Sequence, residues 1–215
     1  MERLDQTPSF IEQARRRQII EATIDCVAET GYSDTSLAKV AQRAKISKSV
    51  VLYYFGEKDE LLTATAQTLL DELGRFIVPK VQAETSAAGQ LRAFIMAECL
   101  FLEQHRSRLV ALSHILMNHR DRNGVLRLQQ EAEKVNLRVW SEILERGQRN
   151  GEFRSFAVKP MANTLTHAIN GALAQWLAEP SLSLSEYAAE LVTLFELATR
   201  QEGKPPAPSG YFTTK

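Results

Sequence analysis

The chain has 215 residues, of which 44% are hydrophobic and 24% charged, a composition typical of a globular protein that buries a sizeable core. Its 26 Lys and Arg balance 26 Asp and Glu, so overall charge does not indicate a nucleic-acid partner. The amino terminus is polar, and no apolar run approaches the roughly 20 residues that span a bilayer. We therefore expect a cytoplasmic protein without a membrane partner. Cys26 and Cys99 form no C-x-x-C motif and are expected to be reduced and buried rather than redox-active.

Nearly every segment has helical periodicity, and no alternating run is long enough to predict a sheet, so the expected fold class is all-α. The first helix is predicted at about residues 11–30, with Gly31 as its stop. A second short helix is expected to begin at a cap formed by Asp34 and Thr35. A third follows Ser47, which is a good N-cap residue. These three helices would form a compact head.

The remainder of the chain predicts a larger helical bundle, the body, joined to this head. Its helices are expected at residues 57–79, 87–104, 109–118, 125–147, 160–178 and 185–200, the first stopping at Pro79 and the last capped by Ser185. The Gly- and Pro-rich end, residues 203–215, is expected to be a disordered tail. The predicted domains are therefore residues 1–56 for an amino-terminal arm and helix-turn-helix domain, and 57–202 for a helical ligand-binding and dimerisation domain.

Residues 35–58 are the most informative stretch, because they read as two short helices joined by a tight turn. Ile46 and Val51 are placed to form a hydrophobic staple, and Val51 and Phe55 would fix the second of these helices against its neighbours. That arrangement is how a helix-turn-helix unit presents a recognition helix to a DNA major groove. A solvated helical face could show the same charges. The stretch carries one acidic residue, Glu57, against five basic ones, which are Lys39, Arg43, Lys45, Lys48 and Lys58.

The first turn of the predicted recognition helix carries side chains suited to reading bases. Lys48 can donate to guanine, and Ser49 can donate or accept. Tyr53 and Tyr54 can give hydroxyl hydrogen bonds to phosphates, with ordinary packing as the alternative for each. The amino termini of the second and fourth helices, with Thr35, Ser36 and Lys58 alongside, offer N–H groups to the same phosphate backbone.

This array resembles the amino-terminal domain of the TetR family of bacterial transcriptional regulators. Four elements occur in register: Gly31-Tyr32, Thr35, Tyr53-Tyr54-Phe55 and Lys58-Asp-Glu-Leu-Leu62. The resemblance implies DNA contacts by Thr35, Ser36, Lys48, Ser49, Tyr53, Tyr54 and Lys58. Three positions depart from the family pattern: Lys45 stands where a turn glycine is usual, Leu52 where tyrosine is frequent, and Ser49 where glycine is frequent. Either Lys45 tolerates the glycine conformation or the turn differs slightly.

The resemblance also implies a homodimer that pairs through the last two long helices, where the residues alone leave an intramolecular core equally open. Both helices carry apolar residues at i, i+3 and i+4 spacing. The predicted dimer contacts are Leu165, Ile169, Leu173, Trp176, Leu191, Leu194 and Phe195.

An uncharged polar stripe beside this apolar face fits the wall of a pocket that orients a ligand, although a solvated face or a hydrogen-bonded interface explains it almost as well. It consists of Asn163, His167, Asn170 and Ala174. Other candidate pocket residues, each with plain core packing as the alternative, are Met96, Cys99, Phe101, His114, Met117 and Trp140.

The sequence predicts a sequence-specific DNA-binding regulator, a repressor released from double-stranded operator DNA by an unidentified small-molecule inducer. The alternative is a helical adaptor that keeps the fold but does not bind DNA. An enzyme is not expected, because there is no H-E-x-x-H, G-x-S-x-G, P-loop or dinucleotide fingerprint. We accordingly assign no catalytic residue, no cofactor and no metal site.

Overall fold

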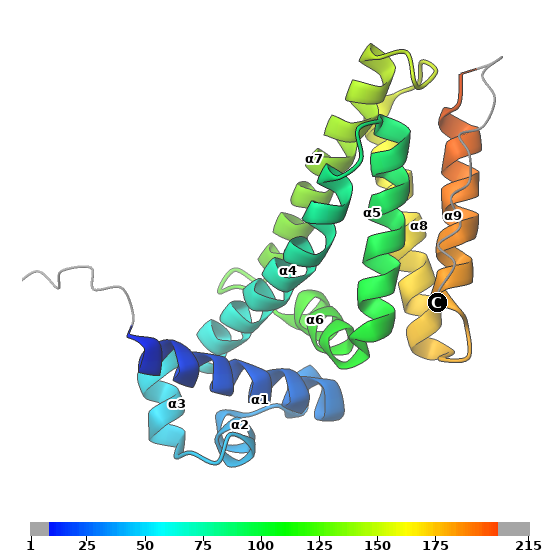
Figure 1. Cartoon of the computed structure of the whole chain (residues 1–215). Helices are drawn as coiled ribbons and strands as arrows, with labels where there is room; N and C mark the ends of the chain where they lie inside the picture. The colour runs from blue at the N-terminus through cyan, green and yellow to red at the C-terminus, as the bar shows by residue number, and fades with distance from the viewer. Residues whose placement is uncertain (1–8, 202–215) are drawn as a thin grey trace, which may run out of the picture. The chain divides into compact units, whose positions relative to one another are not determined.

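A computed structural model describes residues 9–201, so the predicted tail at residues 203–215 lies outside the described residues. Within that range the structure contains nine α-helices and one isolated antiparallel bridge between Phe153 and Arg200 (Figure 1). This confirms the all-α prediction. No helix of the described range is long and apolar enough to cross a membrane. The helices are α1 (Phe10–Asp34), α2 (Leu37–Arg43), α3 (Lys48–Phe55), α4 (Lys58–Gln82), α5 (Ala87–Gln104), α6 (Arg106–Asn118), α7 (Arg127–Arg149), α8 (Val158–Ala178) and α9 (Leu184–Thr199).

Gly31 interrupts α1 where the sequence predicts a stop: its φ of 80° and ψ of 171° are not helical, and glycine adopts a positive φ without steric cost. A short helical piece follows this kink, so α1 ends at Asp34. The predicted stop of the fourth helix is wrong. α4 continues past Pro79 to Gln82. Pro79 lacks the N–H that would bond to the preceding turn, but its own carbonyl accepts a hydrogen bond from the Ala83 N–H at 3.1 Å, so the last turn of α4 still forms.

The predicted cap of the last helix is also wrong by two residues. The Ser183 hydroxyl, not that of Ser185, caps α9 by accepting a hydrogen bond from the Glu186 N–H at 3.2 Å. The two serine hydroxyls lie 2.7 Å apart, so Ser185 supports the cap instead of forming it. Spacing alone cannot choose between two serines at i and i+2, because both precede the same apolar run.

The described chain packs as two compact units, which we describe separately. Unit 1 contains residues up to Gly74 and the segment Gln104–Ala132, and unit 2 contains Arg75–Glu103 and everything from Glu133 onward. α4 runs through both units. A division by packing does not test where functions separate, so the predicted boundary between residues 56 and 57 stays a prediction.

Unit 1 has one continuous apolar core that α1, α2 and α3 share with the first half of α4 and with α6. Ile19 and Val40 are fully buried in it, as are Val51 and Leu62. Ile115 of α6 belongs to the same core. α6 therefore folds with the head, although some fifty residues of sequence separate it from α3.

Arg108 fixes α6 to two neighbouring helices of unit 1. One Nη atom of Arg108 lies 3.0 Å from the nearer carboxylate oxygen of Glu21 on α1, and its Nε lies 3.4 Å from a carboxylate oxygen of Glu72 on α4. The guanidinium is mostly covered, so these ion pairs are screened less than exposed ones.

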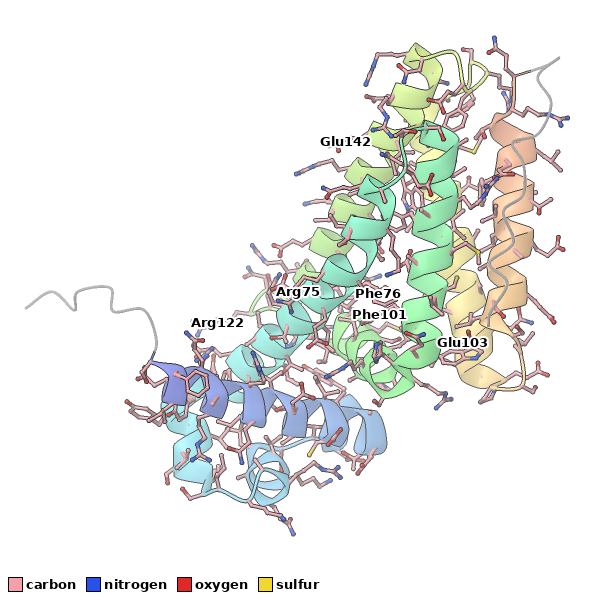
Figure 2. The ribbon with its side chains drawn as sticks, in the orientation of Figure 1. Arg75, Phe76, Phe101, Glu103, Arg122 and Glu142 are labelled. Atoms are coloured by element: carbon pink, nitrogen blue, oxygen red, sulfur yellow. The ribbon has the colours of Figure 1, made fainter. Side chains whose placement is uncertain are left out.

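Aromatic contacts organise the core of unit 2. The rings of Phe94 on α5 and Trp140 on α7 lie 4.2 Å apart between centroids. Phe76 on α4 and Phe101 on α5 make a second contact at 5.3 Å, and Figure 2 shows the two labelled side by side. Gly147 allows α7 to approach the chain that follows it, because a Cβ atom there would lie 2.1 Å from the ring of Phe153.

Two thiols and one carboxyl group are buried in environments that oppose their ionisation. Cys26 and Cys99 are free and buried, and burial raises the pKa of both thiols, that of Cys99 to about 12. Glu98 on α5 is 8% exposed, and burial raises the pKa of its carboxyl from 4.5 to about 7. The two thiols are therefore held in the unreactive protonated form.

The buried carboxyl of Glu98 predicts a pH-dependent stability. Its pKa is higher in the folded than in the unfolded chain, so the folded state binds more protons between pH 4.5 and 7 and loses stability as the pH rises through that window. Glu98→Gln, which mimics the neutral form, should leave stability unchanged near pH 4 and raise the free energy of unfolding by roughly 3 kcal/mol at pH 8. Urea unfolding of both proteins at the two pH values measures this; equal stability at pH 8 would contradict it.

Candidate DNA-binding surface

The recognition helix α3 is built as its sequence predicts. The Ser47 hydroxyl caps it by accepting a hydrogen bond from the Val50 N–H at 3.4 Å. Val51 and Phe55 are buried on its inner face, and Ile46 packs on the same core as Val51, as the predicted staple requires. Eight residues are too few for a stable isolated helix, so this packing determines where α3 lies.

Polar side chains of α1 hold the turn and the far end of the helix-turn-helix unit. Arg16 donates from Nη1 to the carbonyl oxygen of Tyr54 at 2.7 Å, and its guanidinium lies 4.3 Å from the centroid of the Phe55 ring. Gln18 donates from Nε2 to the carbonyl oxygen of Ala44 at 2.8 Å. Ala44 is the residue that ends α2, so α1 fixes both the turn and the far end of α3.

The turn itself keeps the conformation that glycine would favour. Lys45 has a φ of 53°, and it is the only residue other than glycine with a positive φ in the described range. Of the two possibilities that the sequence left open, Lys45 therefore adopts the left-handed conformation and accepts its strain. The connection between α2 and α3 is a tight turn despite the missing glycine.

The outer face of α3 presents the predicted contact residues to solvent. Lys48 and Ser49 are exposed in the first turn, and Tyr53 is 78% exposed. Tyr54 is partly buried, and its ring meets that of Tyr53 edge to face with centroids 5.1 Å apart. Leu52, where the resemblance leads one to expect tyrosine, is 40% exposed on the same helix.

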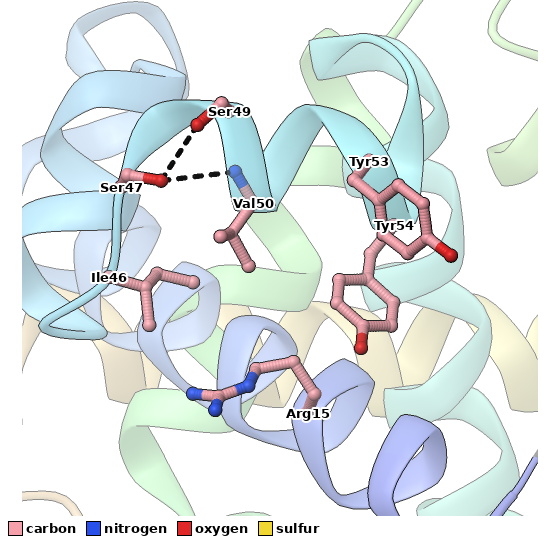
Figure 3. A pocket seen from close by; sticks show the side chains of 7 residues that line it. All are labelled: Arg15, Ile46, Ser47, Ser49, Val50, Tyr53 and Tyr54. Carbon is pink, nitrogen blue, oxygen red and sulfur yellow. Dashed lines mark hydrogen bonds between the residues drawn. The ribbon is translucent and has the colours of Figure 1, made fainter.

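A hollow of about 490 Å³ lies beside this face, between α1 and α3 (Figure 3). It combines a guanidinium with serine and tyrosine hydroxyls, which are groups that bind phosphate. Arg15 of α1 is the member that sequence reasoning missed; its place in the run Arg15-Arg16-Arg17 was the available signal. The lining residues are Arg15, Ile46, Ser47, Ser49, Val50, Tyr53 and Tyr54.

The cap at the start of α2 is formed by Ser36, and Thr35 is buried. Ser36 caps α2 by accepting a hydrogen bond from the Lys39 N–H at 3.3 Å, so the predicted Asp34-Thr35 cap is wrong. Thr35 is buried and its hydroxyl donates to the carbonyl oxygen of Gly31 at 2.7 Å. The Thr35 side chain thus secures the end of α1 and is not displayed on the surface.

Lys58, the first residue of α4, is held by Tyr32 at the end of α1. Its ammonium donates to the Tyr32 carbonyl oxygen at 3.2 Å and lies 5.1 Å from the centroid of that ring. The Tyr32 hydroxyl lies 3.3 Å from Nδ1 of the buried His119, whose Nε2 lies 3.3 Å from the Thr63 hydroxyl. These contacts place Lys58 in a network that reaches the residue following α6.

Part of the local positive charge is neutralised. Arg43 forms two hydrogen bonds with the Glu29 carboxylate and lies 3.5 Å from that of Asp25, so α1 cancels much of its charge. Lys39, Lys45 and Lys48 remain exposed. The positive surface is therefore concentrated around the turn and the start of α3.

Comparison with known proteins agrees with this geometry. The model of bacterial regulatory proteins of the tetR family matches residues 19–65. The HTH-type transcriptional regulator BetI of Paraburkholderia phymatum is 40% identical over 88 residues, which are 40% of this chain and 45% of that protein. BetI of Burkholderia ambifaria is 41% identical over 88 residues, again 40% of this chain and 45% of that protein. The amino-terminal domain belongs to the TetR family.

The fold of the remaining chain is also that of solved TetR-family structures. A putative TetR-family transcriptional regulator from Rhodococcus sp. superposes with a TM-score of 0.73 at 19% identity, covering 87% of this chain and 99% of that one. The fatty acid degradation regulator FadR from Bacillus halodurans superposes with a TM-score of 0.73 at 20% identity, covering 92% of this chain and 100% of that one. At these identities the likeness establishes the fold alone. The sequence match to BetI spans less than half of that protein's length.

The predicted dimer residues lie mainly inside the subunit. Six of the seven are buried within unit 2. They therefore belong to the intramolecular core that the apolar spacing left open as an alternative. The exception is Leu194 on α9, which is 56% exposed, together with Leu197 at 57%. The buried six are Leu165, Ile169, Leu173, Trp176, Leu191 and Phe195.

The candidate pocket residues do not come together in one site. Met96 is partly buried and three others lie in the core of unit 2, whereas the polar stripe of α8 is exposed. His114 and Met117 are exposed on α6, in unit 1. No group of three or more His, Cys, Asp or Glu that could hold a metal ion occurs among residues 9–201. The three core residues are Cys99, Phe101 and Trp140, and the exposed stripe contains Asn163, His167 and Asn170.

The strained turn gives a stability prediction. Lys45→Gly removes the steric cost of the left-handed conformation, whereas Lys45→Ala removes the same charge and keeps that cost. We expect the glycine variant to be about 1 kcal/mol more stable than the alanine variant, because the greater freedom of glycine in the unfolded chain offsets only part of the gain. Thermal and urea unfolding of the two variants compare them directly. A glycine variant no more stable than the alanine variant would show that the turn is unstrained.

Proposed function

We propose that this chain is a sequence-specific DNA-binding transcriptional regulator, a cytoplasmic repressor that a small molecule releases from its operator. The observation that carries the proposal is α3, a short helix fixed by α1 with Lys48, Ser49 and Tyr53 exposed on its free face. The family match over residues 19–65 supports the same function. Repression is the usual mode that the family resemblance implies. An adaptor that no longer binds DNA is less favoured, because Lys45 preserves the turn geometry.

The roles of the surface residues follow from their positions. Lys48 and Ser49 would meet base edges, since residues at the start of a recognition helix enter the major groove. Arg15 and Tyr53 would contact phosphates from the hollow beside α3, with Tyr54 at its edge. Ser36 and Lys58 stand at the amino ends of α2 and α4, where exposed N–H groups favour phosphate. We leave the Thr35 hydroxyl out of this set because it is buried.

We propose a homodimer that pairs through the exposed faces of α8 and α9. Leu194 and Leu197 supply exposed apolar surface on α9, while Gly171 and Ala174 on α8 are small enough to allow close approach. The polar stripe of α8 would then contribute hydrogen bonds across the two-fold axis instead of lining a pocket. A two-fold pair places two recognition helices on half-sites about one helical turn, or a multiple of it, apart.

Regulation would proceed by a shift between conformations with different operator affinity, because an effector acts only through its differential affinity for them. α4 is the connection that we expect this shift to use: like α7 it belongs to both units, and its first residue is Lys58 of the candidate DNA-binding surface. The solved FadR from Bacillus subtilis, which is 21% identical, is in complex with stearoyl-CoA. That ligand is not carried over, because the likeness concerns the fold.

Two substitutions test DNA recognition by separating base contact from phosphate contact. Lys48→Ala should weaken binding to DNA from upstream of the chain's own gene and relax its preference over unrelated DNA. Arg15→Ala should weaken binding to both DNAs alike and reduce the salt slope by about one. Fluorescence anisotropy across a range of salt concentrations measures both effects.

The matched control is Arg75→Ala, which removes an exposed arginine from unit 2 and should leave both slope and preference unchanged. A Lys48→Ala protein with unaltered selectivity would remove Lys48 from the reading role. Absence of salt-dependent binding by the unsubstituted protein to either DNA would favour the adaptor.

Gly74 tests whether α4 flexes where the two units meet. A Cβ atom at Gly74 would meet nothing within 4 Å, so packing does not explain the glycine. Gly74→Ala should raise the free energy of unfolding by up to about 1 kcal/mol and slow hydrogen exchange of nearby α4 amides by more than that global gain. Amides of α8 in the same Gly74→Ala protein are the control, because their exchange should slow only by the global gain. Exchange of the α4 amides that also follows global stability would exclude a local hinge.

A further inference from the structure

Unit 2 contains a cleft of about 370 Å³ between the second half of α4, α5 and α7. Its walls are mainly aliphatic, with Phe94 as the aromatic member, and four polar side chains reach it. None of the pocket residues predicted from sequence lines it. The lining residues are Ile77, Val78, Val81, Gln82, Gln90, Phe94, Val139, Glu142, Ile143 and Arg146.

Arg146 is the chemically distinctive member of this lining. One of its Nη atoms donates to the side-chain oxygen of Gln90 on α5. Its Nε–H is buried and has no acceptor within the described residues. Among residues 9–201 no carboxylate lies within ion-pair distance of the Arg146 guanidinium. A covered cation is thus left with an unused donor at the wall of an apolar cleft.

Arginine cannot relieve this situation by losing its proton, because its pKa is far above physiological pH. A buried donor without an acceptor costs free energy, so a ligand that supplies the acceptor makes a hydrogen bond that the free protein lacks and binds more tightly. A carboxylate does so best, since its two oxygens match two N–H groups of a guanidinium in a planar fork. The hydrogen bond to Gln90 would meanwhile hold the guanidinium in place.

The rest of the cleft limits the size and polarity of such a ligand. A volume of about 370 Å³ is near the lower end of ligand pockets, and the aliphatic walls favour an unsubstituted hydrocarbon body. We propose that this cleft binds a small apolar monocarboxylate, whose carboxylate pairs with Arg146 and whose chain packs against Ile77, Val81 and Phe94. Binding of the carboxylate stands by itself; only the claim that this molecule is the effector rests on the proposed function as a regulator.

Glu142 sharpens the choice of ligand. It lies one turn before Arg146 on α7 and is exposed at the cleft, where Figure 2 labels it. Its charge disfavours a second anionic group on the ligand, which argues against dicarboxylates and phosphate esters. Because Glu142 makes no ion pair with Arg146, it also provides a control that changes charge at the same cleft.

The test uses octanoate as the probe and the fluorescence of Trp140 as the readout. Trp140 packs against Phe94, whose ring lines the cleft, so binding should change its emission. The full chain carrying Trp176→Phe leaves Trp140 as the single tryptophan. Octanoate should bind saturably, whereas octylamine and 1-octanol should bind at least about tenfold more weakly.

Three variants decide the assignment, each checked for folding by circular dichroism. Arg146→Gln should weaken octanoate binding at least about tenfold, whereas Glu142→Gln should leave it equal or tighter. Val139→Phe fills the cleft while keeping Arg146, and should abolish binding. Octylamine binding as well as octanoate, or unchanged octanoate affinity in Arg146→Gln or Val139→Phe, would overturn the proposal.

These measurements contain no DNA, so they are independent of the proposed function. Operator binding is measured separately on the same proteins without octanoate. Operator binding without octanoate binding would overturn this inference and leave the regulator standing. Octanoate binding without any DNA binding would overturn the regulator and leave the carboxylate site standing. Octanoate binding that leaves operator affinity unchanged would overturn the role of the carboxylate as effector.

Discussion

The head depends on the attachment of α3 to α1. Eight residues cannot maintain a helix or its orientation alone, so the free face of α3 is defined only while its inner face is fixed. Val51 and Phe55 provide the apolar part of that attachment. Arg16 and Gln18 provide the directional part, because Arg16 donates to a backbone carbonyl at the end of α3 and Gln18 to one at the turn before it. The groups offered to DNA are thus positioned by residues that need not touch it.

The same unit extends beyond the local motif. Arg108 joins α6 to α1 and α4, and His119 after α6 contacts Tyr32 and Thr63. A displacement of α6 would therefore act first on α1 and on the start of α4, the two helices that fix α3 and carry Lys58. Communication within unit 1 needs no flexible intermediate, since the helices that these contacts join also share one packed core.

Sequence reasoning succeeded where a signal was local and failed where it depended on a distant neighbour. The Ser47 cap follows from residues three apart and the Ile46–Val51 staple from residues five apart; the structure shows the cap and places Ile46 and Val51 on the same core. Helical periodicity located α8 and α9 but did not reveal that their apolar stripes face the subunit's own core. The burial of Thr35 was equally hidden, because it depends on packing around a kinked helix end. Arg146 meets Gln90 across 56 residues of sequence, a separation that no short motif encodes.

Two ionisable groups of unit 2, the buried carboxyl of Glu98 and the partly buried guanidinium of Arg146, respond differently to desolvation. Glu98 escapes desolvation by remaining protonated up to about neutral pH, so its burial needs no counter-charge below that point. Arg146 has no neutral form within reach and must find acceptors, of which the described chain supplies Gln90 alone. Arg146 lines a cleft, so its unused donor lies beside a space that a ligand can enter, which would not hold in a closed core. The fold therefore keeps a charge where an anion can arrive.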